Sequence, residues 1–307
     1  MSLVSVILPN YNYDCFLRQR IDSILSQTYD NIELIILDDC SSDNSFKVIE
    51  SYRKHNKVKA IVYNEHNSGS TFKQWQKGFQ FAEGEFIWIA EADDYADIHF
   101  LEEIVERMKE NKDIKVGFSN SYWVTPNNTF INKDYTIKEH IKIYDGKSFI
   151  KKHLLKENYI YNASMAVFRK DVLTFVDTDF EDYRSCGDKL FWSSIASLGK
   201  VLFVCKPLNY FRIHSEKVTT NSIINGTLFK EEHRLFLKNI EKGYITIWNR
   251  IGIVRYFIKY VERTRNVFLG SSIYNECLAL WQQEMDYRDA HLPLLYRILC
   301  LMQKIFT

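Results

Sequence analysis

Short apolar segments alternate with amphipathic helical segments four times in the first third of this chain. The apolar segments, residues 3–8, 32–37, 58–63 and 86–90, have the length and the aliphatic content of buried strands. Strands that are joined through helices run parallel, because each connection returns the chain to the same edge of the sheet by a right-handed crossover. The pattern therefore predicts an α/β fold with a mainly parallel, Rossmann-like central sheet that is flanked by helices.

The loops that follow these strands are expected to gather at one edge of the sheet, where ligands of open α/β sheets bind. They are residues 9–12, 38–42, 64–70 and 91–94, and all four are polar. We therefore expect one cleft that is lined by four polar loops.

The fourth loop carries three carboxylates within four residues, Glu91, Asp93 and Asp94, directly after a buried strand. Like charges this close repel each other unless a cation lies among them, so the cluster predicts a site for a divalent metal ion. The alternative is a solvated turn in which Asp97 caps the helix that follows.

Several other classes of protein are not supported. No glycine-rich dinucleotide fingerprint and no P-loop follows the first strand, which argues against a dehydrogenase and a P-loop NTPase. The net charge of +1 gives no electrostatic support for binding nucleic acid. The 6 cysteines have neither C-x-x-C nor zinc-ligand spacing, so a reduced, cytoplasmic compartment is expected. No signal peptide is visible, and no apolar run reaches the roughly 18 residues that cross a bilayer.

The chain beyond Thr227 has a helical pattern, with apolar residues at steps of four, three, four and three from Ile247 to Val261. This pattern predicts a first domain of residues 1–225 and a helical C-terminal extension of residues 226–307. The last segment has a broad apolar face beside two cationic residues. That face either packs on its own domain or a partner, or lies on a membrane surface as a peripheral contact.

Five short sequences in the first 94 residues carry a resemblance to a known family. The chain resembles the inverting glycosyltransferases of family 2, which have the GT-A fold. A looser similarity continues through residues 187–192 and 210–214. The five sequences are Val4–Asn12, Ser23–Tyr29, Leu37–Asp43, Ala82–Ile87 and Glu91–Asp94.

The resemblance implies a nucleotide-sugar donor, most simply a UDP-sugar, and an acceptor hydroxyl on a glycan or a lipid-linked glycan. The family's base-binding positions correspond to Tyr11, whose ring stacks, and Asp39, whose carboxylate accepts from the base, while Pro9 gives backbone contacts. Lys73 lies one turn into a helix and is a candidate for contacting the phosphates. The alternatives are a half-buried tyrosine at the rim, a helix-capping aspartate and a solvated lysine.

The family's metal motif is usually D-x-D, and here its first position is Glu91. The resemblance implies Asp93 as the metal ligand, Asp94 as the next candidate, and Glu91 as a donor contact that its longer side chain puts in doubt. Bound Mn²⁺ or Mg²⁺ would offset the charge on the leaving nucleoside diphosphate. Arg212 and His214 match a basic motif that meets the diphosphate or the metal, although a lone histidine is often structural.

Inverting transfer needs a base on the face opposite the leaving group. Asp188 matches the family's base position and begins a helix, and the helix N-terminus is expected to keep it deprotonated at neutral pH. Cys186 and Gly187 stand where the family more often has Glu-Asp, so Asp182 remains a lesser rival. The alternative role of Asp188 is a plain helix cap.

The resemblance implies an inverting glycosyltransferase of hexosyltransferase type that acts by metal-assisted single displacement in surface polysaccharide or glycoconjugate biosynthesis. We expect it in the cytoplasm, and at the inner face of the cell membrane if its last helices bind lipid. A non-catalytic nucleotide-sugar-binding relative and a sugar nucleotidyltransferase are the alternatives. The sequence leaves open the sugar, the base, the acceptor and the oligomeric state. A homo-oligomer is one of the possible states.

Overall fold

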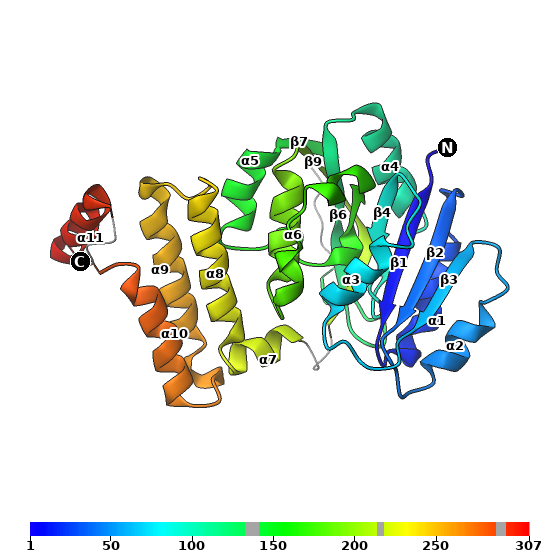
Figure 1. Ribbon diagram of the computed structural model, residues 1–307, viewed down its shortest axis with the longest axis horizontal. Helices are drawn as coiled ribbons and strands as arrows, with labels where there is room; N and C mark the ends of the chain where they lie inside the picture. Colours follow the sequence, from blue (N-terminus) through cyan, green and yellow to red (C-terminus); the bar gives the residue numbers. More distant parts are fainter. Residues whose placement is uncertain (133–140, 214–217, 287–292, 307) are drawn as a thin grey trace. The chain divides into compact units, whose positions relative to one another are not determined.

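A computed structural model describes residues 1–132, 141–213, 218–286 and 293–306 (Figure 1). The chain forms two compact units. The first comprises residues 1–149, 160–181 and 191–215, and the second comprises residues 150–159, 182–190 and 216–307. The predicted domain boundary after residue 225 stays a prediction.

The first unit is built on one mixed, mainly parallel sheet, as predicted (Figure 1). Its strand order is β3-β2-β1-β4-β8-β6-β9-β5, and β7 pairs with β9. Strands β1 to β4 run parallel to one another where they pair, and so do β6 and β9, whereas β5, β7 and β8 are antiparallel to their partners. The strands are β1 Val4–Asn10, β2 Ile32–Asp38, β3 Val58–Tyr63, β4 Phe86–Ile89, β5 Tyr95–Ala96, β6 Ile114–Val124, β7 Ile141–Asp145, β8 Ala166–Arg169 and β9 Lys200–Arg212.

Helices connect the parallel strands of the first unit in the predicted places. Every residue of β1 and β2 is buried, because helices cover the sheet. Gly78 lets α3 lie against the sheet, since a Cβ atom at this position would overlap the side chain of Ile7. The helices are α1 Asp14–Leu25, α2 Ser45–Ser51, α3 Thr71–Phe79, α4 Phe100–Glu110 and α5 Gly146–Phe149, and α6 Gly187–Ala196 is shared between the units.

Several details of the first unit go beyond the alternation of strands and helices. Strand β9 is continuous, because an irregularity in its pairing with β6 accommodates Pro207 opposite Asn120. One 3₁₀ turn, Ala163–Met165, precedes β8, and another, Lys170–Thr174, follows it. The N-cap of α2 is Asn44, and the carboxylate of Asp43 accepts the N–H of Ser45.

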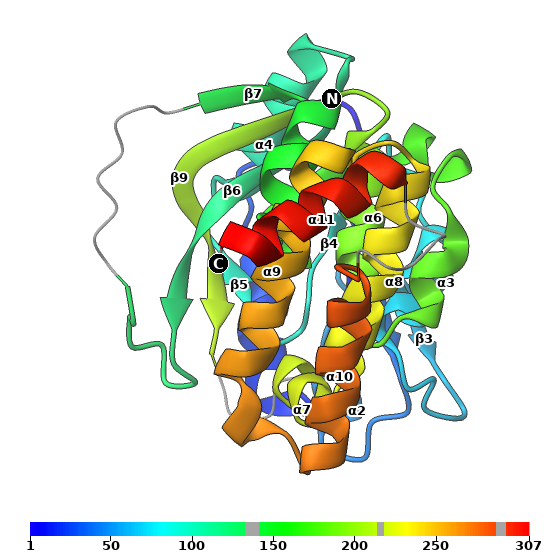
Figure 2. The same cartoon turned by 90° about the vertical axis from the view of Figure 1, so that its left-hand side faces the viewer.

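The second unit is helical. Three of its helices, α8, α9 and α10, lie side by side, and α11 contacts α9 (Figure 2). Their common core is the ring of Trp281, which stacks on Phe257 at 4.3 Å and meets Phe236 edge-on at 5.4 Å. None of the described helices combines the length and hydropathy that crossing a membrane requires. The helices are α7 Val218–Ile224, α8 Thr227–Glu241, α9 Ile247–Arg263, α10 Ser271–Gln283 and α11 Leu294–Phe306.

The last helix has a docked side and an exposed side. Tyr296 and Cys300 are buried against Ile251 of α9. Five apolar residues of α11 are nevertheless exposed. They are Leu294, Leu295, Ile298, Leu301 and Met302.

Candidate functional site

The loops after β1 and β2 are joined by side-chain hydrogen bonds. Asn10 Nδ2 donates to Asp38 Oδ1 at 2.7 Å, and Asn12 Oδ1 accepts the N–H of Ser42 at 2.8 Å. Asn12 and Cys40 have left-handed backbones, with φ of 57° and 63°, a conformation that is costly for a cysteine. Two of the four predicted polar loops therefore meet at the carboxyl ends of their strands.

Asp39 is buried, and its carboxylate is held by the loop after β3 and by α3. Oδ1 accepts from Asn64 Nδ2 at 2.6 Å, from the N–H of Ser68 at 2.9 Å and from Gln74 Nε2 at 3.0 Å. Oδ2 accepts from Ser68 Oγ at 2.8 Å. These donors fix the direction of the carboxylate, and Oδ2 keeps a lone pair for a further N–H. The alternative in which Asp39 caps α2 does not match these contacts.

Glu91 is bound by two other side chains of α3. Its Oε1 accepts from Trp75 Nε1 at 2.9 Å and from Thr71 Oγ1 at 3.3 Å. Burial and the charge of Asp93 raise the pKa of Glu91 to about 8, against the effect of these donors. Because Gln74 and Trp75 are neighbours, the first turns of α3 connect Asp39 to residues 91–94, which we call the acidic loop.

Asp94 is fully buried within the first unit. Its Oδ2 accepts from Asn162 Nδ2 at 2.7 Å and its Oδ1 accepts the N–H of Arg212 at 3.0 Å. Burial and the charge of Asp93 raise the pKa of Asp94 to about 6, and the charge of Arg20 opposes this rise. With no exposed surface and both oxygens engaged, Asp94 is poorly suited to bind a metal ion, and the partly exposed Asp93 is the better candidate.

Arg212 does not support the predicted contact with a diphosphate. Its side chain is buried over the ring of Phe16, with the guanidinium carbon 4.3 Å from the ring centre. All its nitrogens donate to protein acceptors, so the guanidinium anchors the backbone of the loop that carries Asp93. The acceptors are Asp93 O at 2.7 Å, Thr125 O at 3.1 Å, Pro126 O at 2.8 Å, Asn128 Oδ1 at 2.9 Å and Gln19 Oε1 at 2.9 Å.

A second buried arginine was missed by the sequence analysis. Arg20 of α1 is fully buried, and its guanidinium carbon lies 4.7 Å from the centre of the Trp88 ring. None of its nitrogens has a hydrogen-bond partner in the described part of the chain. Burial lowers the pKa of Arg20 to about 10, and the charges of Asp94, Glu91 and Asp93 oppose this decrease. The available signal was its spacing, which places it on the apolar face of α1.

The predicted metal site is partly supported by the electrostatics of the acidic loop. Among residues 1–132, 141–213, 218–286 and 293–306, no three His, Cys, Asp or Glu side chains form a cluster that could hold a metal. Asp93 nevertheless raises the pKa of both Glu91 and Asp94, so the loop has excess negative charge that a hard cation would reduce. Asp93 and Glu91 fit such a cation, and His214 lies outside the described residues.

The remaining donor-site predictions lie at the same edge of the sheet. Pro9 is buried in β1, where it pairs with Leu37 of β2. Tyr11 follows this strand and is 47% exposed. This exposure is compatible both with stacking on a base and with a tyrosine at the rim that has no ligand role. Lys73 is exposed in the first turn of α3.

Asp188 belongs to the second unit, where it is the second residue of α6. Its Oδ2 accepts from Asn158 Nδ2 at 2.7 Å, and its Oδ1 accepts the N–H of Lys189 at 2.7 Å. Burial nevertheless raises the pKa of Asp188 to about 7. The expectation that the helix N-terminus keeps this group fully deprotonated at neutral pH is therefore wrong, because burial outweighs the helix and its donors. A pKa close to the working pH suits a general base.

Two consecutive glutamates of α8 support the start of α6, and the sequence analysis missed both. The carboxylate of Glu231 accepts the N–H groups of Arg184, Ser185 and Cys186 at 2.7, 2.8 and 2.9 Å. Glu232 forms a buried ion pair with Lys189 at 2.8 Å. The rival base Asp182, by contrast, is exposed, with its carboxylate 3.8 Å from Arg234.

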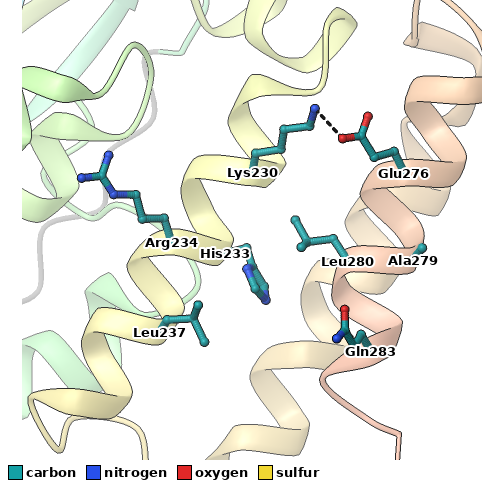
Figure 3. A pocket seen from close by; sticks show the side chains of 8 residues that line it. All are labelled: Lys230, His233, Arg234, Leu237, Glu276, Ala279, Leu280 and Gln283. Atoms are coloured by element: carbon teal, nitrogen blue, oxygen red, sulfur yellow. Dashed lines mark ion pairs between the residues drawn. The ribbon is translucent and has the colours of Figure 1, made fainter.

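A groove of about 480 Å³ lies between α8 and α10 of the second unit (Figure 3). Lys230 pairs with Glu276 at 2.8 Å (Figure 3), and the imidazole of His233 lies 2.9 Å from the carboxylate of Glu284. None of the predicted site residues lines this groove. We therefore treat it as a packing feature of the helical unit.

Comparison with known proteins decides the family. Residues 5–176, more than half of the chain, match the model of Glycosyl transferase family 2. The chain belongs to glycosyl transferase family 2. The matched range includes the predicted donor-site residues from Pro9 to Asp94 and ends before Asp188.

Two family relatives illustrate the range of similarity. An uncharacterized glycosyltransferase of Haemophilus influenzae is 29% identical over 257 residues, which are 82% of this chain and 76% of the relative. The putative teichuronic acid biosynthesis glycosyltransferase TuaG of Bacillus subtilis is 34% identical over 108 residues, which are 35% of this chain and only 42% of TuaG.

The GT-A fold expected of a family 2 member is found in a solved structure. S. aureus TarS 1–349, crystallised in complex with UDP-GlcNAc, superposes with a TM-score of 0.60 at 20% sequence identity. The match covers 94% of this chain and 74% of that chain. At this identity the similarity establishes the fold.

Proposed function

We propose that this family 2 glycosyltransferase transfers a hexosyl group from a UDP-sugar to a hydroxyl of a glycan or a lipid-linked glycan, with inversion, during surface polysaccharide biosynthesis. TarS, which shares the fold, was crystallised with UDP-GlcNAc, and TuaG is named for teichuronic acid biosynthesis. We place the reaction in the cytoplasm, in keeping with six free cysteines. Family membership argues against the sugar nucleotidyltransferase.

One observation carries the proposal: α3 connects two polar centres at the carboxyl edge of the sheet. Gln74 donates to Asp39, and the adjacent Trp75 donates to Glu91. A UDP-sugar could contact both centres at once. Its neutral base offers an N–H at one end, and its diphosphate can share a metal ion with carboxylates at the other. In this proposal Asp39 accepts the N–H of the uracil, and the ring of Tyr11 stacks on it.

The acidic loop is proposed to serve the diphosphate end. Asp93, with Glu91, would hold Mn²⁺ or Mg²⁺, and the bound cation would supply positive charge against the leaving diphosphate. Lys73, exposed in the first turn of α3, would contact a phosphate as a point charge. Asp94 and Arg212 act as anchors that position Asp93.

Asp188 is proposed as the base. The acceptor hydroxyl gives its proton to the carboxylate of Asp188, its oxygen bonds to the anomeric carbon, and the bond from that carbon to the diphosphate breaks on the opposite face. Asn158 orients the carboxylate through its 2.7 Å hydrogen bond. The pKa of about 7 leaves a substantial fraction of Asp188 ionised at neutral pH.

The Asp188→Asn variant tests this proposal. We expect it to lose transfer from UDP-GlcNAc while its affinity for UDP, measured by calorimetry with Mn²⁺, remains that of the wild type. Normal turnover in the variant would remove Asp188 from the mechanism. UDP binding by the wild type without hydrolysis of any UDP-sugar would instead favour the non-catalytic relative.

Peripheral membrane contact through the C-terminal helices remains part of the proposal. It is supported by the exposed apolar residues of α11, which lie opposite the docked Tyr296 and Cys300. Flotation with vesicles of anionic phospholipid tests it, with a variant that replaces Leu294 and Ile298 by Asn. Equal flotation of the variant and the wild type, or no flotation of either, would leave α11 as a packing element.

A further inference from the structure

Three aromatic side chains meet at the carboxyl ends of β6 and β9. Trp123 of β6 lies opposite Phe211 of β9 in the strand register, with ring centres 6.2 Å apart. Tyr161 completes the group, 6.0 Å from Trp123 and 5.6 Å from Phe211. The three rings are tilted by 59–78° relative to one another, so they do not stack face to face. Together they form what we call the aromatic platform.

The platform is both fixed and accessible. Trp123 Nε1 donates to the hydroxyl of Tyr161 at 3.1 Å, and the N–H of Trp123 donates to Asn132 Oδ1 at 2.6 Å. Trp123 is nevertheless 39% exposed. A large, rigid aromatic ring that is held in place and open to solvent is a typical anchor for a ligand.

The platform is continuous with the acidic loop. Tyr161 directly precedes Asn162, whose side chain binds the carboxylate of Asp94. Phe211 directly precedes Arg212, whose N–H binds the other oxygen of Asp94. Neighbouring Cα atoms are about 3.8 Å apart, so the backbone that carries Tyr161 and Phe211 continues directly into the residues that hold Asp94, although successive side chains of β9 point to opposite faces of the sheet.

The chemistry of this surface matches a sugar ring. A pyranose has an apolar face of C–H groups, which packs on an aromatic ring, and a rim of hydroxyls, which hydrogen-bonds to polar neighbours. The platform offers the exposed ring of Trp123 beside the hydroxyl of Tyr161. A lipid chain or an apolar helix would bury a wider, purely apolar surface.

We propose that Trp123, Tyr161 and Phe211 form an acceptor subsite that binds one pyranose ring of the acceptor glycan. This inference rests on the proposed function, because it places the acceptor next to the donor site.

The test is saturation-transfer NMR on the full chain with UDP and Mn²⁺ present. The probes are the methyl β-glycosides of glucose, galactose and N-acetylglucosamine. We expect saturation of the ring C–H protons of at least one glycoside, and about fivefold weaker binding of it by Trp123→Ala. The matched control is Trp248→Ala, which removes a 75% exposed tryptophan of α9 and should change nothing.

The outcomes separate the subsite from the function on which it rests. Loss of glycoside binding in Trp123→Ala, with UDP affinity retained, supports the subsite. Absence of saturation for all three glycosides, or equal binding by the wild type and Trp123→Ala, overturns it even if UDP binds. Failure of the wild type to bind UDP would overturn the proposed function itself. If Trp123→Ala does not fold, Trp123→Phe, which keeps a ring but loses the Nε1 donor, should still weaken binding.

Discussion

The guanidinium of Arg20 lies over the ring of Trp88, 4.7 Å from its centre, without a hydrogen-bond partner in the described part of the chain. A buried cation without hydrogen bonds is costly, so its retention needs compensation. The compensation comes from the acidic loop, since Asp94, Glu91 and Asp93 all favour the charged form of Arg20. Arg20 therefore supplies positive charge, from its buried position on α1, to the acidic loop that we propose to bind a cation.

Replacement of Arg20 by Met should shift the pH dependence of donor binding. The positive charge of Arg20 lowers the pKa of Asp94, so its removal should raise that pKa above the present value of about 6. Because Asp94 and Arg212 together position Asp93, protonation of Asp94 should weaken metal binding indirectly, and we expect the pH midpoint of Mn²⁺-dependent UDP binding, measured by calorimetry, to rise by about one unit. Arg20→Lys should keep the wild-type midpoint, and so should Arg18→Met, which removes an exposed arginine of the same helix. An unchanged midpoint in a folded Arg20→Met protein would contradict this role.

Glu91→Gln should stabilise the protein at high pH in the absence of metal. Burial and the charge of Asp93 raise the pKa of Glu91 from 4.5 to about 8, so the folded state binds this proton more tightly than the unfolded chain. The resulting contribution to stability is fully present below pH 4.5 and is lost as the pH rises through 8. The Tm difference between the variant and the wild type should therefore grow in the variant's favour from about pH 5 to about pH 8.

Thermal unfolding in EDTA measures this difference. Glu110→Gln, at an exposed position at the end of α4, provides the control and should run parallel to the wild type. If the Tm of Glu91→Gln also ran parallel to that of the wild type across this pH range, the pKa of Glu91 would not be raised by folding.

Asp93→Ala should abolish the enhancement of UDP affinity by Mn²⁺. If Asp93 is the principal ligand, its loss should weaken the metal-dependent part of UDP binding by about tenfold or more. Calorimetric titrations with UDP, with and without Mn²⁺, give this ratio directly. Asp30→Ala removes an exposed carboxylate that pairs with Lys57 and should leave the ratio unchanged. An enhancement in Asp93→Ala equal to that of the wild type would show that the cation is held elsewhere.

Glu231→Ala should loosen the loop ahead of Asp188. The carboxylate of Glu231 accepts three backbone N–H groups, and their loss should lower the free energy of unfolding by about 2 kcal/mol. Hydrogen exchange should be faster at the amides of residues 184–186. Turnover should fall as well, because the proposed base lies two residues farther along.

The comparison variants for this experiment are Glu231→Gln and Glu241→Ala. Glu231→Gln keeps one carbonyl acceptor and should retain part of the protection, whereas Glu241 is exposed at the end of the same helix and should be neutral. Protected amides in Glu231→Ala would show that the loop is held by other contacts.

The sequence predicted the sheet and the meeting of its loops well, because both depend on local patterns. The buried strands β1 to β4 appear as apolar runs, and the polar residues after them are brought together by parallel topology alone. The contact between Asn12 and Ser42, 30 residues apart, follows from that topology.

The sequence did not predict how individual side chains are used. Arg212 looked like a cation for the diphosphate, yet five acceptors from three other segments occupy its guanidinium. The pKa of Asp188 followed burial rather than the helix N-terminus, and burial depends on distant packing. Glu231 carried no local signal, because its partners lie 45 to 47 residues earlier.

The hydrogen bonds from Glu231 to a loop 45 to 47 residues earlier also limit which parts of the chain can be exchanged separately. The match to the family model ends at residue 176, so both Asp188 and α8 lie outside the matched range. A chimaera that took its C-terminal helices from a relative would leave the N–H groups of residues 184–186 without their carboxylate partner, unless the incoming helix brought one of its own. Residues 182–190 and these helices should therefore be exchanged together.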